Sequence, residues 1–376
     1  MRIERIGVAA VCVAMLACGD EPASEVDAST RMDAAIQVDG GLDASIVIDG
    51  GRDAAIATDA SGDGGNDASV TALPACEGGT VHEWLSSELA PPLPRDDDRY
   101  RAPAGDARAQ LSSAIESLAA GAWGDALTSA AAAGYVLCRG EDAERDLVLL
   151  RPAMAESGHA TLAIDTAPTN ALILEAPHPL WDRHTATESV EIFDLARARA
   201  VLISGTHRCG SDRPSGCTGM ADACGTDAPV RESDMAHAVD SMFHAAHLAL
   251  AAAYPDALVV SVHGFSDDGV SVSNGTTDDT LASSPSARIA RALATELPTH
   301  PITTCNDFGD PDVPRDARMC GTTNVQGRAL NDVAMECTER ADTASDRFVH
   351  LEQTLALRSG HSAEIAAALI AGVTTP

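Results

Sequence analysis

The chain of 376 residues contains no lysine, so all 25 of its Lys and Arg residues are arginines. Schiff-base and pyridoxal chemistry, phosphate binding by a P-loop and protein-kinase catalysis all use a lysine, which excludes these activities. The sequence also lacks the G-x-S-x-G motif that marks the nucleophile of many serine hydrolases. The formal net charge is −31, which argues against nucleic acid as a partner.

The first 17 residues have the features of a secretory signal. Arg2 and Arg5 precede an apolar run over 6–17 that is too short to span a bilayer as a mature helix. The segment Met15-Leu-Ala-Cys18 resembles a bacterial lipobox, with Met in place of the more usual Leu. We therefore expect a lipoprotein signal peptide over 1–17, a lipid on Cys18, anchoring to a membrane through that lipid and a location in the bacterial cell envelope. An ordinary cleaved signal is the alternative.

Residues 18–73 consist mostly of Asp, Ala, Gly and Ser in loose Asp-Ala and Asp-Gly-Gly repeats. Such a segment has little apolar surface to bury and its like charges repel, so we expect a disordered acidic linker or tether. Calcium binding by the repeats is a weaker alternative, because the nonapeptide spacing of calcium-binding β-rolls is missing. The single folded domain then covers 74–376, and it stays acidic, with 43 Asp and Glu against 21 Arg.

Eight cysteines lie in this domain, an even number in a chain with an export signal, and four disulfides are their simplest arrangement. A structural zinc site made of cysteines is disfavoured, because the sequence has no C-x2-C pair. Fully paired cysteines also leave no thiol nucleophile. The eight are Cys76, Cys138, Cys209, Cys217, Cys224, Cys305, Cys320 and Cys337.

Short apolar runs typical of buried strands alternate with segments of helical periodicity. We predict strands at 147–151, 160–164, 171–176, 200–204, 257–263, 302–305 and from 348 onward. We predict helices at 106–133 with a break at 121–124, from 233 or 234 to 254, and at 185–197, 284–297 and 363–371. This alternation predicts an α/β domain with a central mixed, largely parallel sheet flanked by helices on both faces.

Two of these strands end at a histidine, His178 before Pro179 and His263 before a glycine. Ligands gather at the carboxyl ends of strands in such sheets. Asp182 follows the first histidine by four residues, and Glu188 lies in the first turns of the next helix. We expect one zinc ion per chain, bound by His178, Asp182 and His263, with Glu188 as the alternative carboxylate or as a partner of an imidazole N–H.

Glu352 is the candidate general base. Strand alternation places it on the same face as His350 and Phe348, where a buried acid is costly unless it has a role or a partner. Its role would be to take a proton from the attacking water and to pass it to the leaving nitrogen. A salt bridge from Glu352 to Arg347 or Arg358 is the structural alternative.

Three arginines are candidates for binding a substrate carboxylate through a two-pronged contact: Arg208, Arg328 and Arg358. A second group of histidines competes for a metal, because its members lie near one face of the long helix predicted up to residue 254. The sequence has no H-E-x-x-H motif, so this group is more typical of a core edge or a surface. Its members are His237, His244 and His247.

The order of these motifs resembles the poly-γ-glutamate hydrolase and N-formylglutamate amidohydrolase group. The resemblance covers roughly 171–358 and rests on His178 with its acid, Thr187-Glu188, His263-Gly264, Asn324-x3-Arg328 and His350-Leu-Glu352-x5-Arg358. It implies a zinc carboxypeptidase-like fold, with zinc bound by a His, a carboxylate and a second His, and a downstream Glu as base. Pro179-Leu-Trp181, where the group has glycines, and the cysteine loop at 209–224 depart from the pattern, which affects the substrate more than the metal.

These features together predict a zinc-dependent amidohydrolase or peptidase of the cell envelope that cleaves an amide adjacent to a carboxylate. The acidic surface disfavours a polyanionic polymer, so small peptides or acyl-amino acids are the expected substrates. The alternative is a non-catalytic binding lipoprotein that is tethered to the membrane and retains the hydrolase fold.

Overall fold

The computed structural model describes residues 72–86, 90–140, 145–316 and 318–373. Contacts divide the chain into Met1–Gly65 and Asn66–Pro376, and the second of these units is described below. The expected signal peptide, Cys18 and nearly all of the 18–73 linker lie outside the described residues. Within the described ranges, no helix combines the length and the apolar character needed to cross a bilayer.

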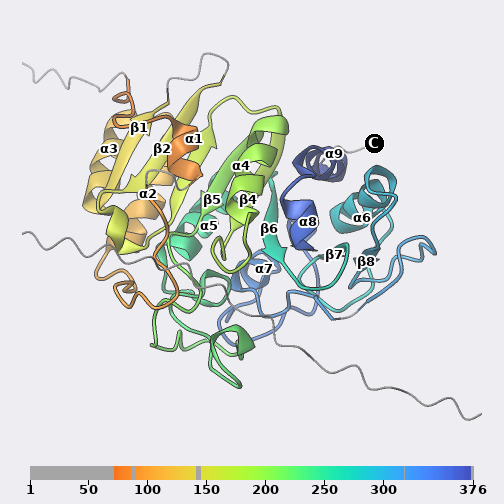
Figure 1. Cartoon of the computed structure of the whole chain (residues 1–376). Helices are drawn as coiled ribbons and strands as arrows, with labels where there is room; N and C mark the ends of the chain where they lie inside the picture. The colour runs from red at the N-terminus through yellow and green to blue at the C-terminus, as the bar shows by residue number, and fades with distance from the viewer. Residues whose placement is uncertain (1–71, 87–89, 141–144, 317, 374–376) are drawn as a thin grey trace, which may run out of the picture. The chain divides into compact units, whose positions relative to one another are not determined.

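A nine-stranded sheet forms the centre of the unit, in the order β1-β2-β3-β5-β4-β6-β9-β7-β8 (Figure 1). Its middle strands run parallel, namely β5 (Ala198–Ile203), β4 (Asn170–Ala176), β6 (Leu258–Gly264) and β9 (Phe348–Gln353). On one side β1 (Tyr135–Arg139), β2 (Leu147–Pro152) and β3 (Thr161–Asp165) continue the sheet with antiparallel pairings. On the other side β7 (Val270–Ser273) is antiparallel to β9, and β8 (Ile302–Thr304) is parallel to β7. The expected α/β class with a mixed sheet is confirmed.

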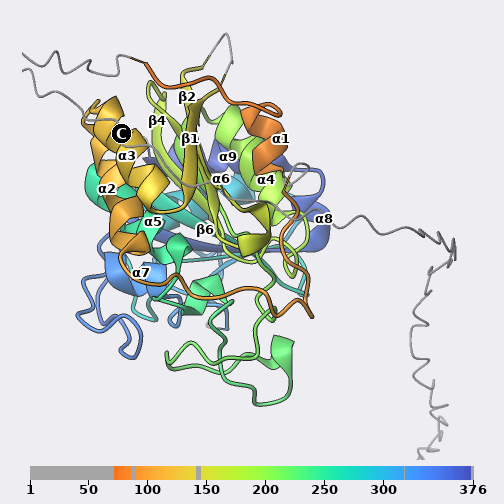
Figure 2. The same cartoon turned by 90° about the vertical axis from the view of Figure 1, so that its left-hand side faces the viewer.

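Helices cover both faces of the sheet, as Figure 2 shows from the side. One face carries α2 (Ala107–Ala119), α3 (Trp123–Ala132), α5 (Met242–Ala253) and α7 (Val325–Leu330). The other carries α1 (Val81–Leu85), α4 (Thr185–Leu195), α6 (Pro285–Glu296), α8 (Leu355–Arg358) and α9 (Ser362–Val373). The sheet is therefore buried on both sides, which explains the continuous apolar runs of its middle strands.

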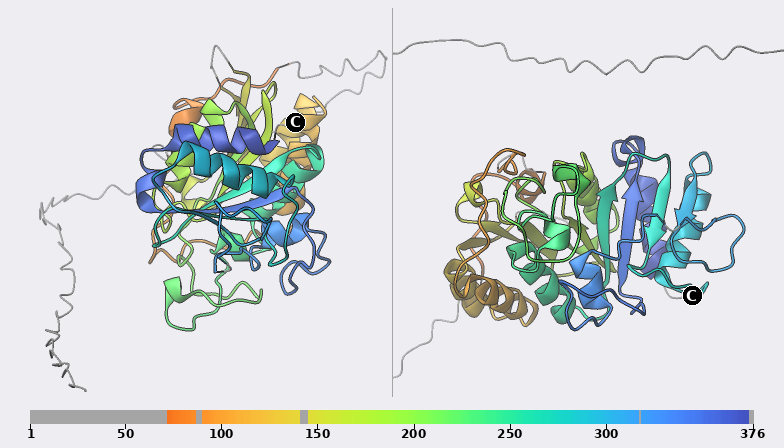
Figure 3. Two further views of the ribbon diagram at one scale, coloured as in Figure 1. Left: turned by 90° about the vertical axis from the view of Figure 1, so that its right-hand side faces the viewer. Right: turned by 90° about the horizontal axis from the view of Figure 1, so that it is seen from below.

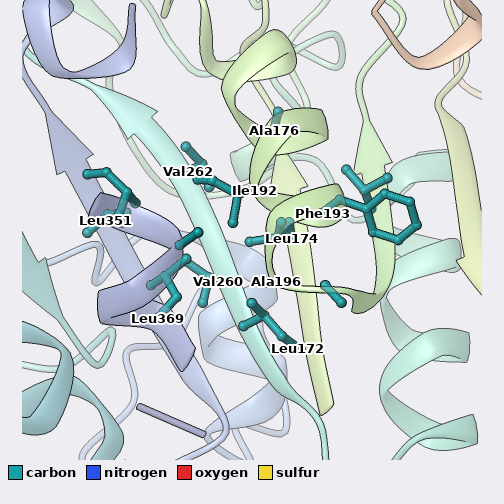
Figure 4. Close-up of a cluster of buried hydrophobic side chains, with 14 of the residues drawn as sticks. Leu172, Leu174, Ala176, Ile192, Phe193, Ala196, Val260, Val262, Leu351 and Leu369 are labelled. Carbon is teal, nitrogen blue, oxygen red and sulfur yellow. The ribbon is translucent and has the colours of Figure 1, made fainter. Parts of the chain in front are cut away.

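Successive residues of a strand point to opposite faces, so the core divides into two clusters. Val260 and Val262 of β6 pack on the α4 and α9 side together with Leu351 of β9 (Figure 4), whereas Val259 and Phe348 pack on the α5 side. A slip of one residue in either strand would exchange the two sets. Burial of each large side chain contributes roughly 1.5–3 kcal/mol, so the core fixes the register of β6 against β9.

The helix predicted to start at residue 233 or 234 begins later, and this prediction was wrong. A short 3₁₀ turn occupies Met235–His237, and α5 starts after Ser241, whose hydroxyl accepts a hydrogen bond from the His244 N–H at 3.0 Å. Asp234 does not cap a helix, because its carboxylate is bound by other side chains, as described below. The sequence pattern did not predict strands β1 and β7 or helix α7.

All eight cysteines of the folded unit are paired, as expected. The bridges are Cys76–Cys138, Cys209–Cys224, Cys217–Cys337 and Cys305–Cys320. The Cys217–Cys337 bridge joins the loop after β5 to the loop before β9. These loops gather at the carboxyl ends of the parallel strands, at the lower edge in Figure 1 and facing the viewer in the right-hand view of Figure 3. The Cys217–Cys337 bridge thus secures the irregular chain over the edge where ligands are expected.

Candidate metal centre

The carboxyl ends of β4 and β6 bring the three expected ligands together. His263 is the second-to-last residue of strand β6, His178 follows β4, and Asp182 lies in the turn that leads into α4. The Asp182 N–H donates to the His178 carbonyl at 2.8 Å, which folds the acid back beside the imidazole. One possible ligand atom of each residue lies within 4.8 Å of the other two, and all three side chains are buried.

Both imidazoles direct the same ring nitrogen at Asp182. His178 Nδ1 lies 3.3 Å and His263 Nδ1 3.4 Å from the same carboxylate oxygen, Oδ2. Two imidazole nitrogens and one carboxylate oxygen are a donor set typical of catalytic zinc, which keeps its fourth position for water or substrate. The residues present therefore fit a zinc ion.

Each imidazole is also held at its other nitrogen. His178 Nε2 lies 2.7 Å from Asp234 Oδ1, and His263 Nε2 lies 2.9 Å from Ser261 Oγ. Metal-binding histidines commonly donate this second N–H to such a partner, which fixes the tautomer and the orientation of the ring. If both Nε2 atoms donate, both Nδ1 atoms keep a lone pair directed at Asp182, as a metal ligand requires.

Asp234 connects several side chains of the centre. Its Oδ1 contacts His237 Nδ1 at 2.9 Å as well as His178, and its Oδ2 accepts two hydrogen bonds from Arg208, at 3.0 and 2.7 Å. Complete burial would raise the pKa of this carboxyl, but Arg208, His237 and His178 hold it well below the usual range. Asp234 therefore holds His178 in position, and together with His178 and His237 it also forms a second group of possible ligands.

The protonation states suit a bound cation. Burial opposes ionisation of Asp182, but His178 and His263 keep its pKa below the ordinary value, so the carboxylate is charged. Burial lowers the pKa of His263 to about 4, which leaves its ring neutral near pH 7. Burial and Arg208 act against the cationic form of His178, but Asp234 and Asp182 outweigh them and raise its pKa. A divalent ion bound there would release the proton of His178.

Glu352 lies beside His263 in the paired strands β6 and β9, and His350 lies beside Ser261. The predicted alternation of β9 is therefore correct, and it carries Glu352 to the face of the sheet that holds the centre. Within the described residues, Glu352 Oε2 has no hydrogen-bond partner, and Oε1 lies 3.7 Å from His350 Nε2. Burial and the charge of Asp182 raise the pKa of Glu352 well above its usual value, against Arg208 and Arg358.

The salt bridge considered for Glu352 is not formed with either arginine in the part of the chain that the structure describes. Arg347 donates instead to the carbonyls of Ala251 and Tyr254, at 2.8 and 3.5 Å. Arg358 donates to the Arg183 carbonyl at 2.6 Å. The buried Glu352 is thus left with an unsatisfied oxygen on the face of the sheet that holds the candidate ligands.

The three candidate substrate arginines occupy different places. Arg208 lines the cleft described below while it donates to Asp234. Arg328 is buried away from that cleft and donates to the main-chain carbonyls of Thr322, Glu336 and Cys337, so its expected substrate role was wrong. Arg358 also lies outside the lining of the cleft.

Arg358 instead packs behind the strand that carries His263. A Cβ atom on Gly264 would lie 2.2 Å from its Cζ, so the guanidinium group depends on the absence of a side chain there. The structure therefore places Arg358 behind the strand that carries His263, and its role as a substrate ligand stays a prediction.

Glu188, the alternative carboxylate, is fully buried but does not belong to any of the possible ligand groups in the described residues. It accepts a hydrogen bond at 3.0 Å from Gln353 Nε2. Gln353 follows Glu352 on β9 and so points to the opposite face of the sheet. Asp182 is thus the carboxylate that contacts both imidazoles. Burial raises the pKa of Glu188 to about 8.

The competing histidine group is split by the late start of α5. His237 lies in the 3₁₀ turn beside Asp234, whereas His247 Nδ1 contacts the buried Glu175 at 2.8 Å and His244 Nε2 contacts Glu336 at 3.3 Å. These three histidines form no common ligand group among the described residues.

A cleft of about 380 Å³ opens over the centre. Its floor includes His178, His263, His350 and Glu352, and its walls come from the loops around 236–237, 318–324 and 340. A larger cavity of about 590 Å³ lies beside α1 and α4, but none of its lining residues belongs to a possible ligand group. The smaller cleft is therefore the candidate active site.

The sequence analysis did not identify Ser261 and Asp234, the residues that orient the two imidazoles. Ser261 precedes His263 by two residues on one strand, so alternation alone would have placed both on one face. Asp234 lies in a loop 56 residues after His178, and no local pattern in the sequence connects the two. Only the folded chain shows that contact.

No family model matches the chain, and a search of curated proteins finds no match. Among solved structures, the N-formylglutamate amidohydrolase of Ralstonia eutropha JMP134 is 12% identical, with 57% of this chain and 96% of that chain covered and a TM-score of 0.32. A candidate metallopeptidase of Shewanella amazonensis SB2B is 11% identical, with 71% and 91% covered and a TM-score of 0.25. The first belongs to the group that the motifs resemble. Because both TM-scores lie well below 0.5, we base the function on the side-chain geometry described above.

Proposed function

We propose that the chain is a zinc-dependent hydrolase of amide bonds, an amidohydrolase or peptidase whose substrates carry a carboxylate next to the cleaved bond. The observation that carries this proposal is the buried convergence of His178 Nδ1, His263 Nδ1 and Asp182, with Glu352 beside them. Small peptides or acyl-amino acids suit the size of the cleft and the acidic surface.

In this proposal His178, Asp182 and His263 hold one zinc ion, which when bound supplies Lewis acidity toward water and toward the amide carbonyl oxygen. Glu352 accepts a proton from the attacking water as the new C–O bond forms at the carbonyl carbon. It then donates that proton to the nitrogen as the C–N bond breaks, so an acid and an amine leave. Asp234 and Ser261 keep the imidazoles in place throughout.

Elemental analysis of the purified full chain tests the metal. We expect about one zinc per chain, lost in His178→Ala and in His263→Ala because each change removes a ligand. His244→Ala serves as the control, since that buried histidine contacts Glu336 and not the centre. Zinc retained in both ligand variants would contradict the assignment.

Turnover of a panel of N-acyl-amino acids tests the role of Glu352 as the general base. Glu352→Gln is expected to keep the zinc and to lower kcat by about 10²- to 10⁴-fold, because the amide cannot accept the proton. Bound zinc without turnover in the unaltered protein would instead favour the binding lipoprotein.

We also propose that Cys18 carries a lipid that anchors the protein in the bacterial cell envelope. The support is the lipobox-like Met15-Leu-Ala-Cys18 sequence and the apolar run before it. Labelling with a radioactive fatty acid in a bacterial host tests this, and Cys18→Ala should abolish the label. A label that persists in the variant would refute the anchor.

A further inference from the structure

Three arginines line the candidate active site of an otherwise acidic protein. Arg208, Arg318 and Arg340 line the cleft, and Glu352 is the one carboxylate among its lining residues in the described part of the chain. The chain as a whole carries a formal charge of −31. In a cleft with low-dielectric walls, an arginine that has no carboxylate partner attracts an anion.

Two of these arginines already have carboxylate partners. Arg208 donates twice to the buried Asp234. Arg318 forms ion pairs with Asp316 at 2.6 Å and with Asp267 at 2.8 Å. Each guanidinium is thus neutralised by the protein itself, and neither needs an anion from outside.

Arg340 is different, because it makes no hydrogen bond or ion pair with any described residue. Its side chain is exposed at the mouth of the cleft that leads to His263 and Glu352. Five N–H donors in a planar fork match a carboxylate group, and a pair of this kind is stronger than a neutral hydrogen bond.

The chain is anchored three residues before Arg340, in a segment that forms no helix or strand. Cys337, three residues earlier, is bonded to Cys217. The Thr218 N–H donates to the Cys337 carbonyl at 3.0 Å, and Arg328 donates to the same carbonyl at 3.2 Å. These contacts anchor the loop close to Arg340, which lowers the entropy that the backbone loses when the guanidinium binds a ligand.

We propose that Arg340 binds the carboxylate of the substrate and so selects acidic substrates over neutral ones. This inference rests on the proposed function for the identity of the substrate, but the binding of a carboxylate by Arg340 requires neither zinc nor turnover. Arg340 takes the role that the sequence had suggested for Arg328.

Calorimetric titration of the full chain with glutarate and with butyrate, which lacks the second carboxylate, tests the proposal with and without added zinc. The unaltered protein should bind glutarate more tightly than butyrate by about tenfold or more. Arg340→Ala should remove most of this preference, and Arg340→Lys should keep part of it. Arg139→Ala is the matched control, because it also removes one positive charge from an exposed arginine but lies on β1, outside the lining of the cleft.

Several results would overturn the proposal: an Arg340→Ala protein with the unaltered preference, an equal loss in the Arg139→Ala control, or no measurable binding of glutarate in either state. Inorganic phosphate that binds more tightly than glutarate and requires Arg340 would overturn the assignment to a carboxylate. Failure of the proposed function looks different, because the protein would then bind no zinc and would bind glutarate and butyrate about equally, while the binding of both acids still depended on Arg340.

Discussion

Replacing Glu188 by Gln should stabilise the protein at alkaline pH. The side chain is fully buried between α4 and β9, and burial raises its pKa from 4.5 to about 8. In the unfolded chain this carboxyl ionises near pH 4.5, whereas in the folded protein it stays protonated up to about pH 8. The folded state therefore loses stability as the pH rises from about 4.5 to about 8.

The magnitude follows from the difference between the two pKa values. The unfolding free energy should fall by about 1.4 kcal/mol per pH unit in this window, since the unfolded chain has released a proton that the folded chain keeps. Glutamine carries no charge at any pH, so the variant avoids this loss. We expect it to match the unaltered protein near pH 4 and to exceed its stability by about 4 kcal/mol at pH 8.

The local contacts can accept the change. Gln353 Nε2 donates to Glu188 Oε2 at 3.0 Å, and the amide oxygen of a glutamine can accept that bond. Glu188 Oε1 and Gln353 Oε1 have no hydrogen-bond partner in the described part of the chain. The new amide N–H group can donate to the second of these oxygens, which would satisfy both residues.

Urea unfolding at a series of pH values, with the disulfides intact, measures the effect. A stability difference for Glu188→Gln that is constant or that shrinks toward pH 8 would refute the reasoning. Loss of zinc in this variant would show that Glu188, and not Asp182, is the carboxylate ligand.

Two further predictions concern the surroundings of the centre. Asp234→Asn should weaken zinc binding by about 10- to 100-fold in competition with a chelator, because the amide holds His178 less well, and unchanged affinity would exclude a positioning role. Serine at both Cys217 and Cys337 should lower the affinity for glutarate while the zinc content stays the same, because the loop that presents Arg340 loses its covalent support. Equal glutarate affinity in calorimetry would show that the hydrogen bonds alone hold that loop.

The sequence predicted the parts of the centre that depend on local pattern. Apolar runs located β4, β6 and β9, and the residues at their carboxyl ends, His178, His263 and Glu352, meet because parallel strands end at the same edge. Alternation on β9 correctly placed Glu352 on the face away from Leu351. Asp182 was within reach because four residues suffice for one tight turn.

What the sequence did not predict depends on contacts between distant segments. Ser233 or Asp234 was expected to cap the long helix, but the Asp234 carboxylate instead contacts the distant His178 and Arg208 as well as the neighbouring His237. Arg328 and Arg340 have the same side chain, so the sequence does not distinguish them. Only the fold shows that Arg328 donates its hydrogen bonds to main-chain carbonyl groups. Strand β7 has only four residues, too few for a clear alternation.

The proposed zinc ligand His263 and the proposed base Glu352 belong to adjacent strands, while Arg340 belongs to a loop secured by a disulfide. Their separation has a consequence for how such a protein can change during evolution. The packing of the hydrophobic core fixes the spacing between these two side chains. A mutation that changes this spacing must therefore also disrupt the core. The loop at the entrance is free of this constraint, so new substrate preferences can arise there while the chemistry below is preserved.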